Sequence, residues 1–158
     1  MSKYLKILYV VAVCLAAGYL SSLVTQANIE TWYPTIKKPI FNPPNWVFAP
    51  VWTLLFIMMG IAAGLVWDKL KENRELVKKG LFLFTIQLLL NIFWSYIFFS
   101  LKNLLLATIE IVLLLLIIFE TYTVFKKVDK LAGRLLIPYL VWVSFATLLT
   151  ASIYFLNF

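Results

Sequence analysis

Long uncharged stretches separated by short charged segments dominate this chain. Four stretches contain no Asp, Glu, Lys or Arg, namely residues 7–29, 39–67, 80–101 and 135–158. A fifth apolar stretch, residues 104–125, is interrupted only by Glu110 and Glu120. Each stretch provides the roughly 20 residues that a helix needs to cross a bilayer. Alternation with a period of two residues is absent, which disfavours a transmembrane β-barrel.

The pattern therefore predicts an all-α integral membrane protein, a five-transmembrane-helix bundle that forms a single membrane domain over residues 1–158. Five spans of about 20 residues leave room only for short connections. The connection at residues 28–45, called loop 1 below, is the longest. The predicted helices cover about residues 5–27, 46–67, 80–101, 103–125 and 135–154.

Composition and charge support this prediction and add an orientation. The chain is 63% hydrophobic, 13% charged and has a mean hydropathy of +0.94, whereas a soluble domain needs far more polar surface. Its net charge of +7 is unevenly distributed, because the N-terminus and the second and fourth loops carry eleven of the fourteen Lys and Arg residues. The positive-inside rule then predicts a cytoplasmic N-terminus and an external C-terminus. The expected location is the plasma membrane of a prokaryote. The basic residues are interpreted as an orientation signal facing the lipid bilayer, and no nucleic-acid partner is expected.

The chain contains few residues of the kinds that bind metals or cofactors. The chain has no His and a single cysteine, Cys14, so the commonest metal ligand and general base is missing and no intrachain disulfide can form. We expect no metal site, no cofactor and no ordinary catalytic constellation. The first apolar stretch lacks a small-residue cleavage site and is interpreted as a retained helix.

Loop 1 concentrates aromatic and proline residues. Trp32, Tyr33 and Phe41 lie on it, and the Pro43-Pro44 pair excludes a regular helix there. One interpretation is an interfacial aromatic belt, since Trp and Tyr gather at the headgroup level of membranes. The other is a proline-stiffened, preformed lid over a ligand site, whose low conformational entropy favours binding.

The third predicted helix has the clearest polar stripe. Gln87, Asn91, Trp94, Ser95 and Phe98 fall at helical spacing on one face. Amide groups in hydrocarbon are costly, so this face is expected to point into the bundle. It provides either hydrogen bonds between helices or the polar wall of a ligand site.

The remaining helices carry weaker signals. Gly60 and Gly64 form a GxxxG pattern, which favours close helix contact within the protein or between two protomers of a homodimer. The small residues of the first helix, from Cys14 to Thr25 at helical spacing, predict a packing face. Glu110 is expected to face the interior. In the fifth helix Pro138 is expected in the first turn, and Trp142 is followed four residues later by Ala146 on the same face.

Short motifs of aromatic, proline and amide residues are distributed along the chain. They are Trp32-Tyr33, Lys38-Pro39, Pro43-Pro44, Trp46-Val47-Phe48, Pro50-Val51-Trp52-Thr53, Met59-Gly60, the Gln87 to Asn91 segment, Trp94-Ser95, Phe98-Phe99, Pro138-Tyr139, Trp142 and Phe145-Ala146. In these motifs the chain resembles the TspO/MBR family of tryptophan-rich sensory proteins and translocator proteins, which includes the peripheral benzodiazepine receptor.

The resemblance implies a five-helix bundle, commonly dimeric, with a pocket that opens towards loop 1 and binds porphyrins such as protoporphyrin IX or a similar flat hydrophobic ligand. The implied function is porphyrin sensing or handling. Lys37 and Lys38 either meet the porphyrin propionates or are simply solvated, and the absence of His favours the metal-free macrocycle. The implied pocket residues are Trp32, Tyr33, Trp52, Asn91, Trp94, Ser95, Trp142 and Ala146.

Two other functions remain open. The first is light-dependent porphyrin breakdown, as reported for some members of the resembled family, with Trp32 and Trp142 as redox candidates. The second is transport of porphyrin or another hydrophobic ligand, although the chain lacks the internal repeats of secondary transporters.

The chain also departs from the family's usual pattern. Phe41 and Tyr154 stand where the family usually has Trp, and Thr150 where it usually has Asn.

Overall fold

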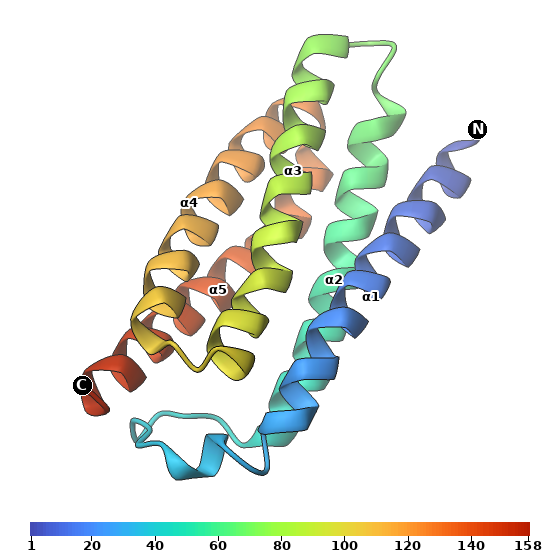
Figure 1. Ribbon diagram of the computed structural model, residues 1–158. Helices are drawn as coiled ribbons and strands as arrows, with labels where there is room; N and C mark the ends of the chain where they lie inside the picture. Colours follow the sequence, from blue (N-terminus) through green and yellow to red (C-terminus); the bar gives the residue numbers. More distant parts are fainter.

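Five long helices make up the computed structural model, which describes all 158 residues (Figure 1). Each helix is long and apolar enough to cross a membrane. The fold class predicted from the sequence, an all-helical five-span membrane protein, is therefore confirmed. The helices are α1 (Lys3–Asn28), α2 (Asn45–Asp68), α3 (Arg74–Ser95), α4 (Leu104–Val128) and α5 (Lys130–Leu156).

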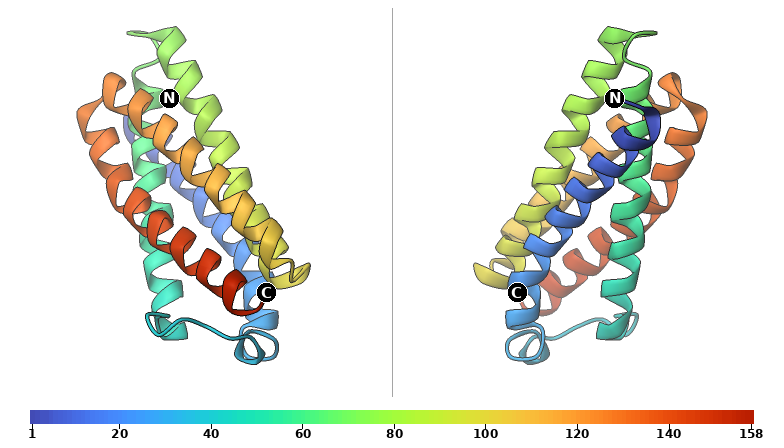
Figure 2. Two further views of the ribbon diagram at one scale, coloured as in Figure 1. Left: turned by 90° about the vertical axis from the view of Figure 1, so that its left-hand side faces the viewer. Right: turned by 90° about the vertical axis from the view of Figure 1, so that its right-hand side faces the viewer.

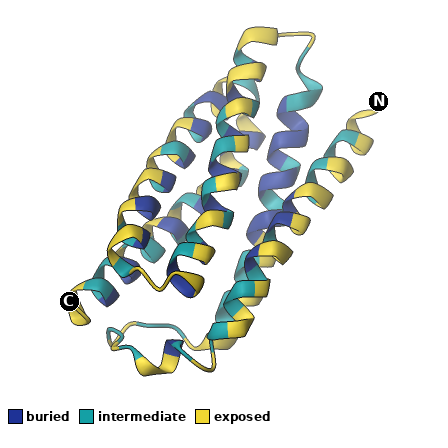
Figure 3. Ribbon diagram, viewed as in Figure 1, coloured by how far each residue is buried: buried dark blue, intermediate teal, exposed yellow.

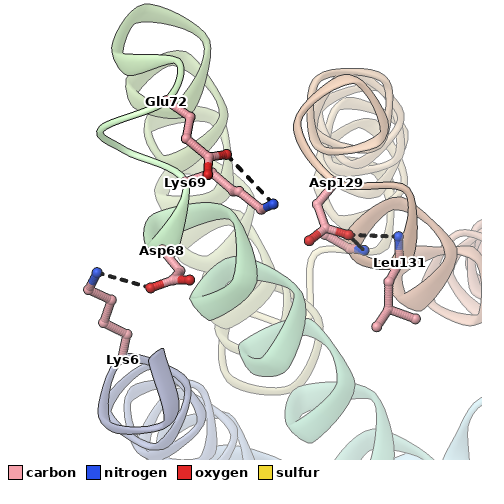
Figure 4. Close-up of polar contacts among 7 residues, drawn as sticks. Lys6, Asp68, Lys69, Glu72, Asp129 and Leu131 are labelled. Atoms are coloured by element: carbon pink, nitrogen blue, oxygen red, sulfur yellow. Dashed lines mark hydrogen bonds and ion pairs between the residues drawn. The ribbon is translucent and has the colours of Figure 1, made fainter. Parts of the chain in front are cut away.

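Two helices begin earlier than the sequence predicted. α3 starts at Arg74 rather than near residue 80, and α5 starts at Lys130 rather than near residue 135. The predicted bounds stopped at charged residues, whereas a helix can continue beyond the apolar span into the aqueous boundary. For α5 the start is set by Asp129, whose Oδ1 accepts hydrogen bonds from the backbone N–H groups of Leu131 and Ala132 (Figure 4). As a result Pro138 lies inside α5 and not in its first turn, which corrects the expectation.

Glycines bring α1 and α2 into backbone contact. A Cβ placed on Gly60 would lie 2.6 Å from the Cα of Val11, and one on Gly64 would lie 2.6 Å from the Cα of Ile7. Both distances are too short for any side chain, so only glycine permits this approach. The GxxxG pattern thus joins two helices of one chain, which accounts for it without a second protomer.

Acidic side chains at the α2–α3 end of the bundle are largely occupied by local contacts. Lys6 pairs with Asp68 at 3.3 Å and so joins the start of α1 to the end of α2, while Lys69 pairs with Glu72 at 3.6 Å (Figure 4). The four acids at this end are outnumbered by its eleven Lys and Arg residues, so the end keeps a net positive charge. The charge asymmetry seen in the sequence therefore persists in the fold.

The interior of the bundle is largely apolar and consists of a large cluster of 20 buried residues and a smaller one of six that includes Tyr33 of loop 1. α2 is the most enclosed helix, with half of its most apolar segment buried, whereas α1 presents a large exposed apolar surface (Figure 3). α1 packs on α2 and α3, α4 packs on α3 and α5, and α2 meets α5 across the centre. Exposed apolar side chains on the outer faces of such helices suit contact with lipid rather than water.

The end of α3 changes its winding before the connection to α4. Residues Tyr96–Ser100 form a π-helical turn, in which the backbone N–H of Leu101 bonds to the carbonyl oxygen of Tyr96 at 2.9 Å. Such turns rotate the following side chains relative to a regular helix. Here Phe98 and Phe99 are both buried, and both contact loop 1. The π turn therefore links α3 to the loop.

Candidate ligand cavity under loop 1

A cavity of about 780 Å³ lies in the half of the bundle that loop 1 closes. Its walls come from α1, α2, α3 and α5, with a small contribution from α4 and from the start of loop 1. Two thirds of the lining residues are hydrophobic, and the polar ones are few and uncharged except Glu30 at the loop end. This volume and this mixture are typical of small-molecule sites.

The structure brings most of the predicted site residues to this one cavity. Trp32 is the exception, because it lies outside the lining and packs edge-on against Phe98 and Phe99, with the Lys102 ammonium 5.7 Å from its ring. The predicted residues that line the cavity are Tyr33, Trp52, Asn91, Trp94, Ser95, Trp142 and Ala146.

Two indole rings form an aromatic corner between α2 and α5. The Trp52 and Trp142 rings meet edge to face with their centroids 6.5 Å apart. Trp52 also contacts Phe56 at 5.7 Å, and Trp142 contacts Phe145 at 5.5 Å. Each ring is therefore held by a neighbouring ring, so that the wall is formed before any ligand binds. Flat apolar surfaces of this kind suit an aromatic guest.

The polar stripe of α3 has both roles that the sequence left open: some of its residues form hydrogen bonds between helices, and others line the cavity. The Tyr139 hydroxyl donates to Gln87 Oε1 at 2.7 Å and accepts from Asn91 Nδ2 at 2.6 Å, so α3 and α5 are joined by a buried polar network. Gln87 does not line the cavity and acts in helix packing. Asn91 has both roles. It lines the cavity, and its amide N–H donates to the Tyr139 hydroxyl in the contact between α3 and α5. Trp94 and Ser95 line the wall beyond it.

Loop 1 closes the end of the cavity through its 3₁₀ turn, Tyr33–Thr35. The Tyr33 ring is 4% exposed and lies against Phe98 and Phe99, while its hydroxyl donates to Asn42 Oδ1 at 2.9 Å. Burial raises the pKa of Tyr33 to about 12, and the bond to Asn42 only partly opposes this, so the phenol remains a neutral donor. These buried contacts support a lid rather than an interfacial belt.

The two lysines of the loop do not act as a pair. Lys38 Nζ donates to the carbonyl oxygens of Tyr33 and Ile36, each at 2.9 Å, and lies 4.8 Å from the centre of the Tyr33 ring. The Lys38 ammonium therefore holds loop 1 together through these two hydrogen bonds, called the Lys38 staple. It is not free to bind a porphyrin propionate, which was one of the two roles considered for it. The Lys37 side chain is exposed.

The far edge of loop 1 is held by the C-terminus of α5. Asn157 Nδ2 donates to the Lys37 carbonyl oxygen at 2.8 Å, and its Oδ1 accepts from the Lys37 backbone N–H at 2.9 Å. This two-bond clasp joins residues 120 positions apart. Phe41 adds an edge-on contact to Phe145 of α5. Loop 1 is thus fastened to α3 on one side and to α5 on the other.

Replacing Asn157 with alanine is expected to release this clasp and leave the bundle intact. Three side-chain hydrogen bonds are lost, two to Lys37 and one to the Ile153 carbonyl oxygen of α5, and the two that hold the loop are worth about 1 kcal/mol each. Amide hydrogen exchange over residues 36–42 should therefore accelerate by about tenfold or more, while exchange in α2 and α4 stays unchanged. Asn73→Ala is a matched control, because Asn73 is exposed and its side chain makes no capping bond. Unchanged exchange in loop 1 of the Asn157 variant would show that the clasp does not hold the lid.

Residues of α1 form one wall of the cavity. Gly18, Ser22 and Thr25, whose spacing predicted only a packing face, line the cavity together with Ser21. The Ser21 hydroxyl is buried without a hydrogen-bond partner, as are the indole N–H groups of Trp94 and Trp142. The helical spacing of small residues shows that they share one face of α1. It does not show whether that face packs against another helix or lines a cavity. Glu110 is buried as expected and does not line the cavity.

Comparison with known proteins identifies the family. The TspO/MBR family model matches residues 10–156, nearly the whole chain. The chain belongs to the TspO/MBR family. It is 45% identical to the tryptophan-rich protein TspO of Chlorobaculum tepidum over 93% of this chain and 92% of that protein. It is 39% identical to the TspO of Archaeoglobus fulgidus over 97% of each chain, and 37% identical to the human translocator protein over 78% of this chain and 73% of the human one.

Within this TspO/MBR protein, the three positions expected to differ from the family's usual residues lie around the lid and the cavity. Phe41 packs on Phe145, and Thr150 lines the cavity while its hydroxyl bonds to the Ala146 carbonyl oxygen of its own helix. Tyr154 is partly buried near the C-terminus and contacts Phe155 and Phe158. A hydroxyl satisfied by its own helix leaves the cavity wall at Thr150 effectively apolar.

Proposed function

We propose that this membrane protein binds a tetrapyrrole of the protoporphyrin IX type in the cavity under loop 1 and serves in porphyrin sensing or handling. The observation that carries the proposal is the aromatic corner of Trp52 and Trp142 inside a largely apolar cavity of about 780 Å³. Ligand sites of a few hundred to about 1,000 Å³ enclose most of the surface of a drug-sized molecule. A flat macrocycle gains both apolar burial and ring contacts in such a site.

The lining favours a metal-free ring over haem. The chain contains no His, and its single thiol, Cys14, is buried in the core and is not among the lining residues. The usual axial ligands to haem iron are His, Cys, Met or Tyr side chains. The only tyrosines among the lining residues are Tyr19 and Tyr33, and Tyr33 is committed to Asn42.

The charge distribution supports an orientation in which the α2–α3 end faces the cytoplasm and loop 1 faces the other side. Eleven basic residues lie at the former end and three near the latter. In this orientation the lid meets the external compartment, the C-terminus is external, and the cavity lies in the outer half of the membrane. We place the protein in the plasma membrane of a prokaryote.

The proposal is tested by titrating the purified protein in nanodiscs with protoporphyrin IX while following porphyrin fluorescence. Ala146→Phe inserts a ring into the cavity, and it is expected to weaken binding by at least tenfold because packed sites tolerate added volume poorly. Ser144→Phe is the matched control, since Ser144 is exposed on the same helix and does not line the cavity. Saturable binding of one porphyrin per cavity, weakened only in the Ala146 variant, is the expected result. Equal affinity in both variants would remove the cavity as the porphyrin site.

A second function, light-dependent porphyrin breakdown, is favoured by one feature of the cavity. Trp142 is among the residues that line it, so an indole would lie beside a bound macrocycle, whereas the other redox candidate, Trp32, lies outside. Illumination of the complex should then yield a new absorbing product that a Trp142→Phe variant fails to form. Bleaching identical to that of free porphyrin would count against an enzymatic role.

A further inference from the structure

The cavity is open on the side between α1 and α2. Its lining includes residues that face outwards from the bundle, among them Tyr19, which is 64% exposed, and Trp46, which is 74% exposed. Ala49 and Thr53 of α2 are also exposed and also line it. A cavity whose wall contains outward-facing side chains of two neighbouring helices is continuous with the surface between those helices.

The geometry of the helix pair accounts for this opening. α1 and α2 touch backbone to backbone at Gly60 and Gly64, and Gly18 still lies tightly against the Phe56 ring. Beyond this point the helices separate towards loop 1, as the right-hand view of Figure 2 shows. The helices are thus in contact at one end and diverge at the other, where residues of both line the cavity; this region is called the gap. The groove residues Tyr19, Ser22, Ala49 and Thr53 lie along that gap and line the cavity.

The gap begins at the loop 1 end of the two helices, where Trp46 lies near the start of α2, and extends to the depth of the hydrocarbon. Thr53 is eight residues beyond Asn45, the first residue of α2, and Ser22 is six residues before Asn28, the last residue of α1. At 1.5 Å per residue both lie about 10 Å inside the ends of their helices. The hydrocarbon core of a bilayer is about 30 Å thick. The groove residues therefore face lipid chains.

The Ser22 and Thr53 hydroxyls at the gap are satisfied within their own helices, which suits contact with lipid. The Ser22 hydroxyl donates to the Tyr19 carbonyl oxygen at 2.7 Å, and the Thr53 hydroxyl donates to the Ala49 carbonyl oxygen at 2.8 Å. Each hydroxyl is therefore paired within its own helix and presents no unsatisfied donor to hydrocarbon. In contrast, the loop 1 end is closed by the Tyr33 contacts, the Lys38 staple and the Asn157 clasp.

We propose that the gap between α1 and α2 is a lateral portal through which apolar or amphipathic molecules dissolved in the bilayer enter and leave the cavity. The inference rests on the proposed function in so far as porphyrin is the ligand, but the portal itself requires only the cavity and its open side. Entry from the bilayer uses the high local concentration of an apolar ligand in the membrane. It also leaves loop 1 closed throughout.

The test measures the kinetics of uptake from vesicles that already contain the probe. Protoporphyrin IX is the first probe, and Nile red, an uncharged planar dye that partitions into bilayers, is the second. Quenching of tryptophan fluorescence reports their arrival in the cavity. The double variant Ser22→Phe/Thr53→Phe narrows the gap from both sides, and it is expected to slow association and dissociation together by at least tenfold. The double control Leu23→Phe/Leu54→Phe adds rings at adjacent, exposed positions that do not line the cavity, and should leave both rates unchanged.

The two probes separate the portal from porphyrin recognition. If protoporphyrin does not bind but Nile red enters, and only the Ser22/Thr53 variant slows it, the portal stands and the porphyrin proposal fails. If either probe enters the wild type and the Ser22/Thr53 variant at the same rate, the portal is overturned, whatever the affinity. Exclusion of both probes from the wild-type protein overturns the portal as well, because an open groove admits at least one of them.

Discussion

Replacing Gly60 with leucine is expected to lower the free energy of unfolding by more than about 3 kcal/mol, near the upper end of the range for overpacking a tight interface. The reason is local and steric. A Cβ at this position would lie 2.6 Å from the Val11 Cα and 2.9 Å from the Val11 backbone nitrogen. Backbone atoms cannot rotate away as a side chain does, so α1 must separate from α2. Unfolding in mixed micelles, followed by circular dichroism, measures the loss.

Ala12→Leu provides the control, because Ala12 is exposed on α1 and a larger apolar side chain there faces lipid. We expect its stability to remain within about 0.5 kcal/mol of the wild type, as for other surface changes. The alternative role of the glycines, contact between two protomers, gives a different result. If Gly60→Leu leaves the stability of the monomer intact and only abolishes a dimer, the intramolecular role assigned to this glycine is wrong.

Removing both indoles of the aromatic corner is expected to weaken protoporphyrin binding by about 5- to 150-fold. Trp52→Leu/Trp142→Leu keeps the wall apolar but removes two ring contacts, each worth about 0.5–1.5 kcal/mol beyond its buried area. Both rings line the cavity and are held in place by Phe56 and Phe145. Isothermal titration or porphyrin fluorescence measures the change in affinity.

The matched control is Trp67→Leu. Trp67 lies at the opposite end of α2, where its ring contacts Tyr9 at 6.0 Å, and it does not line the cavity. The affinity of this variant should equal that of the wild type. Circular dichroism checks that the Trp52/Trp142 double variant is folded. If its affinity for protoporphyrin is unchanged, contacts with the two indole rings are not the basis of recognition.

Much of the candidate site could be predicted from helical spacing together with the family resemblance. The α3 stripe was placed inside the bundle because amides are costly in hydrocarbon, and Gln87 and Asn91 are indeed buried. Spacing alone could not assign their partners, since both meet Tyr139, which lies 48 positions beyond Asn91 in the chain. Trp32 was predicted to line the site, but it packs against Phe98 and Phe99 of the π turn and is not among the lining residues.

The sequence could not show whether a small residue on a helix packs against another helix or lines a cavity. Gly60 and Gly64 were consistent with a contact inside the chain or between chains, and the α1 series around Gly18 and Ser22 was assigned to packing. In the fold the α2 glycines join α1, whereas Ser22 lines the cavity. The difference arises from the angle between α1 and α2, which brings one end of the pair together and opens the other.

By itself, the sequence determined that the chain is helical and membrane-embedded, with five spans, and that a stiff aromatic loop precedes the second span. Hydrocarbon imposes length, apolarity and internal hydrogen bonding on each span separately, so these properties can be predicted one segment at a time. Only the tertiary structure decided which faces enclose the cavity, which amides are already paired, how the lid is fastened and where the wall is open. Those features depend on the rotation and crossing of helices, which are set by side chains that meet from distant parts of the chain.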